Sequence, residues 1–258
     1  METTLDGAGI EIEDLHYAYG AKKALDGVSL SIRRGRFTAV LGPNGAGKST
    51  LFSLLCGLIA SRNGRIRVLG FELSEAPRAA LLQMGIVFQQ PTLDLDLSVA
   101  QNMTYFGALR GLSGKACKRR AADCLQRMGL NGREREKARD LNGGHRRRLE
   151  IARTMLCEPS LLLLDEPTVG LDVPSRAALV DHVHELCIES RLTVLWATHL
   201  VDEVWPEDDL VVLHQGQVRA AGAVREVLAN TGSADVNAAF AALTAPRQSP
   251  ASAEAAAP

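Results

Sequence analysis

The stretch FTAVLGPNGAGKSTLFSLLCG, residues 37–57, decides how this chain folds. It opens on an apolar run that predicts a buried strand, and a helix is expected to begin near Lys48. The glycine-rich loop between them carries four residues at the spacing G-x-x-x-x-G-K-[ST]: Gly42, Gly47, Lys48 and Ser49. Glycines allow backbone N–H groups to surround a phosphate, and the helix N-terminus directs its positive dipole end at the same anion. The stretch therefore predicts a phosphate-binding loop, or P-loop.

The residue types of this loop match phosphate chemistry. Lys48 supplies a point charge for the β- and γ-phosphates of a nucleotide, and the Ser49 hydroxyl can hold Mg²⁺. The alternative is a glycine-rich turn that happens to contain a lysine. The strand before the loop and the helix after it favour the nucleotide-binding interpretation.

Composition limits the class of protein. The chain has 258 residues, of which 46% are hydrophobic and 23% are charged, as expected for a globular protein of one or two domains. Its formal net charge of -1 gives no general attraction to nucleic acid, so no nucleic-acid partner is expected. Two short basic runs, Arg33–Arg36 and Arg146–Arg148, are most simply interpreted as solvated faces.

Targeting signals and cysteine pairs are also missing from the sequence. No apolar run is long enough to cross a bilayer, and the N-terminal segment METTLDGAGIEIED is acidic, unlike a signal peptide. The 5 cysteines are scattered without a C-x-x-C pair, which favours reduced, mostly buried thiols over metal ligands. We therefore expect a cytoplasmic protein.

Hydrophobic patterns divide the chain into regions. Alternating residues over 25–32 and 64–68 predict antiparallel strands beside the P-loop. Apolar residues at helical spacing after residue 92 predict an all-helical insertion, and the run Leu161–Leu164 predicts a buried parallel strand. We expect one domain over 1–240, divided into a β layer and P-loop core (about 8–91), the helical insertion (about 92–157) and the rest of the core (about 158–230), with a disordered tail over 244–258.

Several predicted strands end in chemically suitable groups. In an open α/β sheet, ligands bind at the carboxyl ends of the strands. Asp165 can hold Mg²⁺ there, Glu166 can act as general base for a water that attacks the γ-phosphate, and His199 can donate to that phosphate. Taken alone, Asp165-Glu166-Pro167 can be a turn and His199 a structural histidine, but the P-loop upstream favours the functional interpretation.

Together these motifs resemble the nucleotide-binding subunit of an ABC transporter over residues 8 to about 230. Gly42–Thr50 matches the Walker A motif and Leu161–Glu166 matches Walker B with its catalytic glutamate. Gln89 matches the Q-loop glutamine, which touches Mg²⁺ or water and faces the membrane partner. Tyr19 matches the aromatic residue that stacks on adenine, and His199 matches the switch histidine.

Two further segments match the parts of the family that act across a dimer. Leu141–His145, LNGGH, lies where the family has its LSGGQ signature, and Gly170-Leu171-Asp172 matches the D-loop. Asn142 replaces the signature serine and His145 replaces its glutamine, while Gly143 and Gly144 keep the backbone nest. Asn142 can offer an N–H₂ donor, so we expect a working site with altered affinity; a hydrolysis-poor site is the alternative. His145 adds a titratable group.

The resemblance implies an α/β P-loop NTPase with a RecA-like core, an antiparallel β subdomain and an inserted α-helical subdomain. It implies ATP and Mg²⁺ as cofactors, with Ser49, Gln89 and Asp165 at the metal. It implies that two subunits, expected to be identical, sandwich two ATPs and drive a separate permease at the inner face of the membrane. The residues implied in nucleotide binding are Tyr19, Gly42, Pro43, Asn44, Gly45, Ala46, Gly47, Lys48, Ser49, Thr50, Asn142, Gly143, Gly144 and Asp172.

The branch of the family is suggested by short strings. QQPTLDLDLSV and GHRRRLEIARTML resemble exporter-type ATPases, and LNGGHRRR resembles the ATPase beside pyrroloquinoline-quinone-dependent alcohol dehydrogenase systems. The alternating leucines of Pro91–Leu97 fit either the core or contact with a coupling helix of the permease. The competing function is a soluble single-cassette ABC ATPase of an assembly or regulatory system without a permease.

Overall fold

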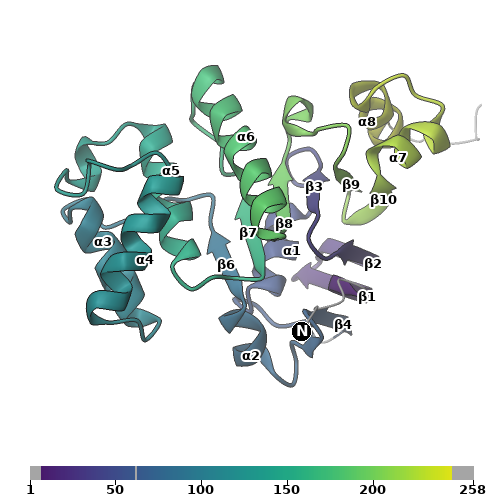
Figure 1. Cartoon of the computed structure of the whole chain (residues 1–258). Helices are drawn as coiled ribbons and strands as arrows, with labels where there is room; N and C mark the ends of the chain where they lie inside the picture. The colour runs from purple at the N-terminus through teal and green to yellow at the C-terminus, as the bar shows by residue number, and fades with distance from the viewer. Residues whose placement is uncertain (1–6, 62, 246–258) are drawn as a thin grey trace, which may run out of the picture.

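The computed structural model describes residues 7–61 and 63–245, and it contains a parallel and an antiparallel sheet (Figure 1). The larger sheet has 6 strands in the order β10 (Gln217–Ala223), β9 (Asp209–His214), β3 (Phe37–Leu41), β8 (Thr193–Thr198), β7 (Leu161–Asp165) and β6 (Met84–Val87). Its strands are parallel except for β10, which forms a hairpin with β9.

The central strands of this sheet are buried on both faces. Every residue of β3, β7 and β8 is buried, which explains why they appear in the sequence as continuous apolar runs rather than alternating ones. Leu41 at the end of β3 pairs with Thr198, and Asp165 at the end of β7 pairs with Ala197. This register brings the carboxyl ends of three strands to one edge of the sheet.

The smaller sheet is antiparallel, as the alternating pattern predicted. Its strands follow the order β2 (Lys22–Arg33), β1 (Ala8–Tyr19), β4 (Asn63–Val68) and β5 (Phe71–Glu72). Apolar residues of β1 and β2, such as Ile10, Leu15 and Val28, share one core with the helix α1 (Lys48–Leu55) that follows the P-loop. The antiparallel layer therefore packs directly against the nucleotide-binding element.

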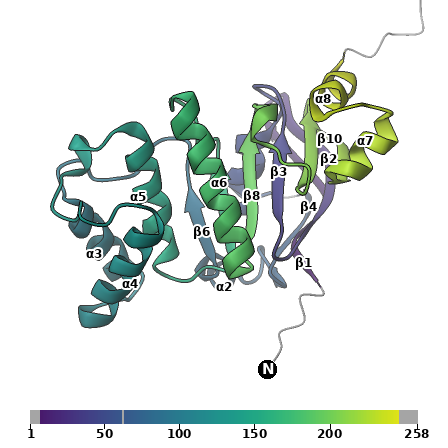
Figure 2. The same cartoon turned by 45° about the horizontal axis from the view of Figure 1, so that its top comes forward.

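Three helices form a separate layer at the side of the parallel sheet. They are α3 (Val99–Leu109), α4 (Gly114–Arg127) and α5 (Gly143–Met155), and both views place them together beyond β6 (Figures 1 and 2). α3 begins with a capping box between Ser98 and Gln101, which satisfies N–H groups at its N-terminus. These helices confirm the predicted fold class, an α/β protein with an antiparallel layer and an inserted helical part.

The remaining helices cover the sheet and its edge. The long helix α6 (Val173–Ser190) crosses the parallel sheet, with Pro174 in its first turn as expected. Three short helices were not predicted from the sequence: α2 (Pro77–Leu82), α7 (Val224–Thr231) and α8 (Val236–Thr244). Thr244, which the sequence placed in the tail, is the last residue of α8. Residues 246–258 of the predicted tail lie outside the described residues.

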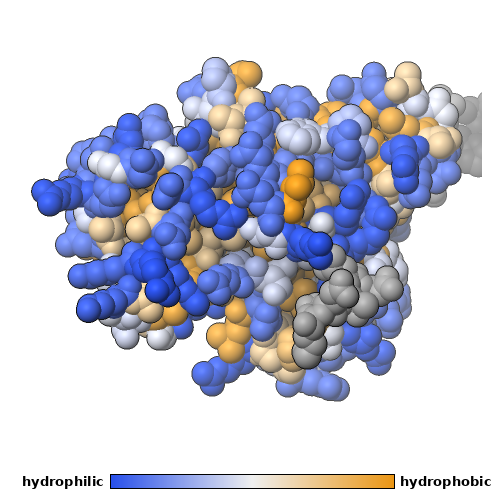
Figure 3. Space-filling view, viewed as in Figure 1, coloured by the Kyte–Doolittle hydropathy of each residue, from blue (hydrophilic) through white to orange (hydrophobic). Residues whose placement is uncertain are grey.

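The surface and the cysteines agree with the composition. Figure 3 shows a mostly hydrophilic face with apolar side chains confined to small patches. All five cysteines are free, and Cys56, Cys117 and Cys187 are buried, as predicted. Within the described part of the chain, no helix combines the length and the hydrophobicity that crossing a membrane requires.

The core makes a direct prediction about stability. Leu163 lies in the middle of β7 and is fully buried, whereas Leu109 at the end of α3 is 67% exposed. Leu163→Ala is expected to lower the free energy of unfolding by about 2–5 kcal/mol, because it removes buried methyl groups and leaves a cavity. Leu109→Ala is the control and should change it by less than about 0.5 kcal/mol. Chemical denaturation of both variants measures the difference; equal losses would contradict the buried position of β7.

Candidate functional site

The P-loop connects β3 to α1, and two of its glycines, Gly42 and Gly47, sit where no side chain fits. A Cβ on Gly42 would lie 2.4 Å from the carbonyl oxygen of Leu213. Gly47, the N-cap of α1, has φ 110, and a Cβ there would lie 2.6 Å from the carbonyl oxygen of Ala24. The turn of the β9–β10 hairpin fixes the loop further, because the Gly216 N–H donates to the Ala46 carbonyl at 2.9 Å. The sequence therefore needs glycine at these positions for backbone reasons.

Lys48 is the charged centre of the site. It is only 4% exposed, and its Nζ donates to the Gly42 carbonyl at 2.7 Å. The same Nζ lies 3.1 Å from Glu166 Oε1, so the P-loop lysine and the residue after β7 form a buried ion pair. A buried ammonium group is unfavourable unless it is paired and hydrogen-bonded, and here both conditions are met.

Asp165 and Glu166 stand side by side at the end of β7 in different environments. Burial raises the pKa of Asp165, and the neighbouring Glu166 charge raises it further, while the Ser49 hydroxyl and Lys48 lower it. Glu166 has φ 44, a left-handed conformation that a non-glycine residue rarely adopts and that often occurs at active sites. The turn is held by the Glu166 N–H, which donates to the Ala197 carbonyl at 3.0 Å.

One oxygen of this pair fits a cation site. Asp165 Oδ1 is buried without a hydrogen-bond partner among the described residues, and it lies on the side chain that faces Ser49. Carboxylate and hydroxyl oxygens are the ligands that Mg²⁺ prefers, and an unsatisfied buried carboxylate oxygen is suited to receive one. Among the residues that the structure describes, no group of three or more His, Cys, Asp or Glu side chains is placed to hold a metal ion. The donor set therefore fits a hard divalent ion that is shared with a phosphate.

His199 and Gln89 complete the same cavity. His199 Nδ1 lies 3.3 Å from Glu166 Oε2, on the segment that leaves β8. Gln89 is exposed and follows β6. The cavity has a volume of about 480 Å³, and its walls include P-loop residues together with Tyr19, Gln89, Glu166 and His199. Asp165, which was also predicted from a strand end, does not line it.

Tyr19 is held by the β1–β2 ribbon. It is the last residue of β1, where it pairs with Lys22 of β2, and it is 53% exposed. Its ring meets that of Tyr17 edge to face, with the centroids 5.0 Å apart. An exposed aromatic ring at the mouth of the cavity can stack on a nucleotide base.

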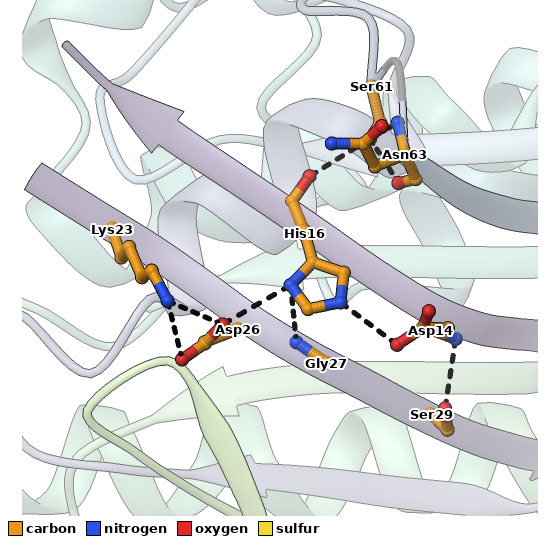
Figure 4. Close-up of polar contacts among 8 residues, drawn as sticks. All are labelled: Asp14, His16, Lys23, Asp26, Gly27, Ser29, Ser61 and Asn63. Atoms are coloured by element: carbon orange, nitrogen blue, oxygen red, sulfur yellow. Dashed lines mark hydrogen bonds and ion pairs between the residues drawn. The ribbon is translucent and has the colours of Figure 1, made fainter. Parts of the chain in front are cut away.

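A polar cluster on the same ribbon ties β1 and β2 together (Figure 4). His16 on β1 lies between Asp14, at 2.9 Å, and Asp26 on β2, at 3.2 Å. The Gly27 N–H donates to His16 Nδ1 at 3.1 Å, and Lys23 pairs with Asp26. Lys23 also lines the P-loop cavity. The cluster therefore anchors the ribbon that presents Tyr19.

The predicted signature and D-loop residues lie elsewhere. Asn142 is the N-cap of α5, and its Oδ1 accepts the His145 N–H at 2.8 Å. Asp172 is the N-cap of α6 and accepts the Ser175 N–H at 2.7 Å, which lowers the pKa of its carboxyl. Gly143 faces Leu171 and Gly144 faces Ser175, so the signature and the D-loop are neighbours. None of these residues lines the P-loop cavity.

His145 is affected by its surroundings. Burial lowers the pKa of its imidazole, and the charges of Arg133 and Arg148 lower it further, against a smaller opposing effect of Glu136. These surroundings therefore favour the uncharged form of the ring.

The leucines after the Q-loop divide between the two expectations. Leu93 is buried in the main core, whereas Leu95 is 42% exposed. Both line a cavity of about 280 Å³ that also includes Gly143 and Leu171. Of these two leucines, only Leu93 packs in the core, although the alternating pattern would suggest this for both.

Sequence reasoning was wrong about the second basic run and missed a buried glutamate. Arg147 is not on a solvated face: it is 5% exposed and hydrogen-bonds inside the protein. The only sequence signal for this was Glu150 three residues later. Glu203, 1% exposed, accepts from Thr168 Oγ1 at 2.5 Å and from Trp196 Nε1 at 2.9 Å. It joins the segment after Glu166 to the segment after His199, and no local pattern indicated it.

The family model described as ABC transporter matches residues 25–169, more than half of the chain. This chain belongs to the ABC transporter family. The match includes the P-loop, the Q-loop, the signature and Walker B. The predicted resemblance is therefore confirmed, and the chain is an ATP-binding, ATP-hydrolysing subunit of this family.

Individual relatives agree with this assignment. The chain is 39% identical over 224 residues to the daunorubicin resistance ATP-binding protein DrrA3 of Streptomyces coeruleorubidus, covering 86% of this chain and 71% of the relative. It superposes on cbiO1 from Clostridium perfringens, part of the ABC transporter complex cbiONQ, with a TM-score of 0.79 and 32% identity, covering 87% of this chain and 92% of the other. It also matches the dimeric structure of the bacterial cassette MJ0796 with a TM-score of 0.72 and 25% identity, covering 83% and 98%. The resemblance to the pyrroloquinoline-quinone-linked subgroup is not addressed by these proteins and stays a prediction.

The pKa of Asp165 leads to a test of the site without nucleotide. Because its folded-state pKa is raised, ionisation at neutral pH disfavours the folded state. This penalty is absent below the unfolded-state pKa, grows between the two pKa values and is complete above the folded-state pKa. Asp165→Asn should therefore raise the thermal unfolding midpoint at pH 7–8 in metal-free buffer, and the gain should shrink as the pH falls towards about 4, the ordinary range of an aspartate. The control is Asp181→Asn on the exposed side of α6, which should change the free energy of unfolding by less than about 0.5 kcal/mol at any of these pH values. A lower midpoint for Asp165→Asn at every pH would contradict this description of the carboxylate.

Proposed function

We propose that this chain is the ATP-hydrolysing motor of an ABC transporter and that it acts as a dimer on a separate membrane permease. One observation carries the proposal. A single cavity joins the P-loop to Glu166 and His199, and the buried pair of Lys48 and Glu166 lies at its base. Few arrangements other than nucleotide hydrolysis need a phosphate cradle, a carboxylate base and a histidine within one cavity.

The binding roles follow from chemistry and position. Backbone N–H groups of Gly42–Thr50 and the Lys48 ammonium would hold the phosphates, and Tyr19 would stack on the adenine. Mg²⁺ would be held by Ser49, Gln89 and Asp165, where it supplies positive charge to the β- and γ-phosphates. The unpartnered Asp165 Oδ1 supports this assignment.

Hydrolysis is assigned to Glu166. Its carboxylate would accept a proton from a water as the water oxygen bonds to the γ-phosphorus, while the bond from that phosphorus to the bridging oxygen of ADP breaks. His199 would donate a hydrogen bond to the γ-phosphate, and Gln89 would orient the water or the metal. Lys48 pairs with Glu166, so phosphates that bind Lys48 would compete for its positive charge and free the carboxylate for its role as a base.

The position of the signature supports a dimer. Asn142, Gly143, Gly144 and Asp172 lie outside the P-loop cavity, at the N-termini of α5 and α6, and all of them except the buried Gly144 are exposed. In a head-to-tail pair, these residues of one copy would complete the nucleotide site of the other. The likeness to a cassette whose structure is dimeric is consistent with this arrangement.

The partner and the location come from the relatives. DrrA3 is a drug resistance protein and cbiO1 is part of a transporter complex, which supports a permease partner and, with the sequence strings noted above, an exporter. The chain would then lie on the cytoplasmic side, at the inner face of the membrane. A soluble ABC ATPase without a permease is the competing function.

The proposal is tested by capture of the partner. Glu166→Gln keeps the shape of the side chain but removes the base, so it should lower the kcat for ATP hydrolysis by about 100-fold or more and prolong the ATP-bound state. We expect this tagged variant, with ATP and Mg²⁺, to retain a polytopic membrane protein in stoichiometric yield from detergent-solubilised membranes of its own cell. Wild type without nucleotide is the control. Recovery of soluble partners alone, with the chain absent from the membrane fraction, would reject the transporter and favour the competing function.

The signature asparagine gives a separate prediction. Its Oδ1 caps α5, which leaves the side-chain N–H₂ available to a phosphate of the partner's nucleotide. Asn142→Ala should lower the free energy of unfolding by about 1 kcal/mol through loss of the cap and should also reduce ATPase activity. Asn142→Ser retains both a cap and a donor, and its ATPase rate is expected to stay within about tenfold of wild type. Steady-state phosphate release measures this, and a rise of several orders of magnitude would show that Asn142 makes the natural site deficient.

A further inference from the structure

Arg147, from the basic run that the sequence assigned to solvent, reaches across the interior from α5. Its Nη1 donates to the carbonyl oxygen of Phe88 at 2.8 Å and its Nη2 to that of Gln89 at 2.8 Å. Its Nε donates to the carbonyl oxygen of Pro167 at 2.7 Å. One guanidinium therefore holds the backbone of the Q-loop and the backbone that follows Glu166.

A buried carboxylate completes the contact. Glu150, 2% exposed and one helical turn along α5, pairs with Arg147 at 2.7 Å. Its other oxygen accepts the N–H of Thr92 at 2.6 Å, and Arg153 donates to the Thr92 carbonyl at 3.0 Å. α5 thus grips the Q-loop on both sides, at Phe88–Gln89 and at Thr92.

The geometry requires an arginine. Three carbonyls and a carboxylate around one side chain match the planar, five-donor fork of a guanidinium, whereas a lysine ammonium offers three donors from a single point. Burial of this charge is unfavourable in itself, so the network is poorly explained as a source of stability. What the network does is hold the Q-loop at a fixed distance from the Glu166–Pro167 turn.

The helix that carries Arg147 also begins at the signature. Asn142 caps α5 less than two turns before Arg147, so any shift of the signature end moves the guanidinium and the three carbonyls that it holds. The Q-loop residues between the two grips, Gln90 and Pro91, are exposed. The position of Gln89 therefore depends on α5.

We propose that Arg147 is a positioning residue for ATP hydrolysis, which fixes Gln89 relative to Glu166 and makes their alignment depend on the position of the signature helix. Arg147 does not line the P-loop cavity, so it acts through Gln89, which does. The inference rests on the roles proposed above for Gln89 and Glu166. It assigns a task to a residue that the P-loop chemistry does not use.

The first experiment compares Arg147→Lys with a matched control. Lysine keeps the charge opposite Glu150 but cannot hold three carbonyls, so we expect kcat to fall about 10- to 100-fold while the KM for ATP changes less than about twofold, as for a small misplacement of reacting groups. The control is Arg120→Lys on α4, where the arginine likewise donates to a backbone carbonyl, that of Leu156, and pairs with Glu158. It should leave both constants unchanged. A normal kcat in Arg147→Lys would overturn the inference.

A double-mutant cycle separates positioning from a general structural effect. If Arg147 acts through Gln89, then Arg147→Lys should have little further effect on kcat in a Gln89→Ala background. Independent, multiplicative losses would overturn the inference and leave the role of Gln89 intact. A normal kcat in Gln89→Ala alone would instead reject the proposed role of Gln89, and the inference with it.

Thermal unfolding of each variant accompanies the kinetics. If Arg147→Lys does not fold, the cycle is repeated with Arg147→Gln combined with Glu150→Gln, which removes both buried charges together and avoids leaving one unpaired. The same loss of kcat at unchanged KM is expected. A wild-type kcat in this double variant would show that only the balance of the two buried charges matters, and it would overturn the positioning role.

Discussion

The buried ammonium of Lys48 is the constraint on which the rest of the site depends. It cannot remain charged in the interior without close acceptors, and these come from the P-loop carbonyls and from Glu166. Glu166 reaches it only because β7 ends level with β3, with β8 between them. The same register delivers His199 from the end of β8. Parallel pairing of short, fully buried strands thus assembles a phosphate site from segments that are far apart in sequence.

The second organising element is α5. Its N-terminus carries the signature on the exposed side, and its interior side holds the Q-loop and the turn after Glu166 through Arg147 and Glu150. In the proposed head-to-tail pair, α5 would serve two nucleotide sites: its own, through Arg147 and the backbone that it holds, and a partner's, through Asn142. This division would explain why a chain with a P-loop and Glu166 needs a second copy to complete the site.

The sequence revealed those parts whose chemistry is local. Glycine at Gly42 and Gly47, the apolar run of β7 and the acidic pair at its end are all short, contiguous patterns, and the structure brings Glu166 of this pair to the P-loop lysine. Arg147 was misjudged because three adjacent arginines look like a solvated run, and its acceptors are backbone carbonyls from segments 58 and 59 residues away for the Q-loop and 20 for Pro167. The helices α2, α7 and α8 were missed because six to nine residues give too little periodicity to recognise. Leu93 and Leu95 show that alternation alone does not decide which side chains are buried.

The central claim is that one chain holds only half of each nucleotide site. The most direct measurement is the molar mass of the Glu166→Gln variant by sedimentation, with ATP and Mg²⁺, with ADP, and without nucleotide. We expect a molar mass of about twice the 27.7 kDa of one chain with ATP, with two nucleotides bound per pair. With ADP or without nucleotide, we expect the mass of a single chain. A stable 27.7 kDa species that binds ATP tightly and never associates would contradict it.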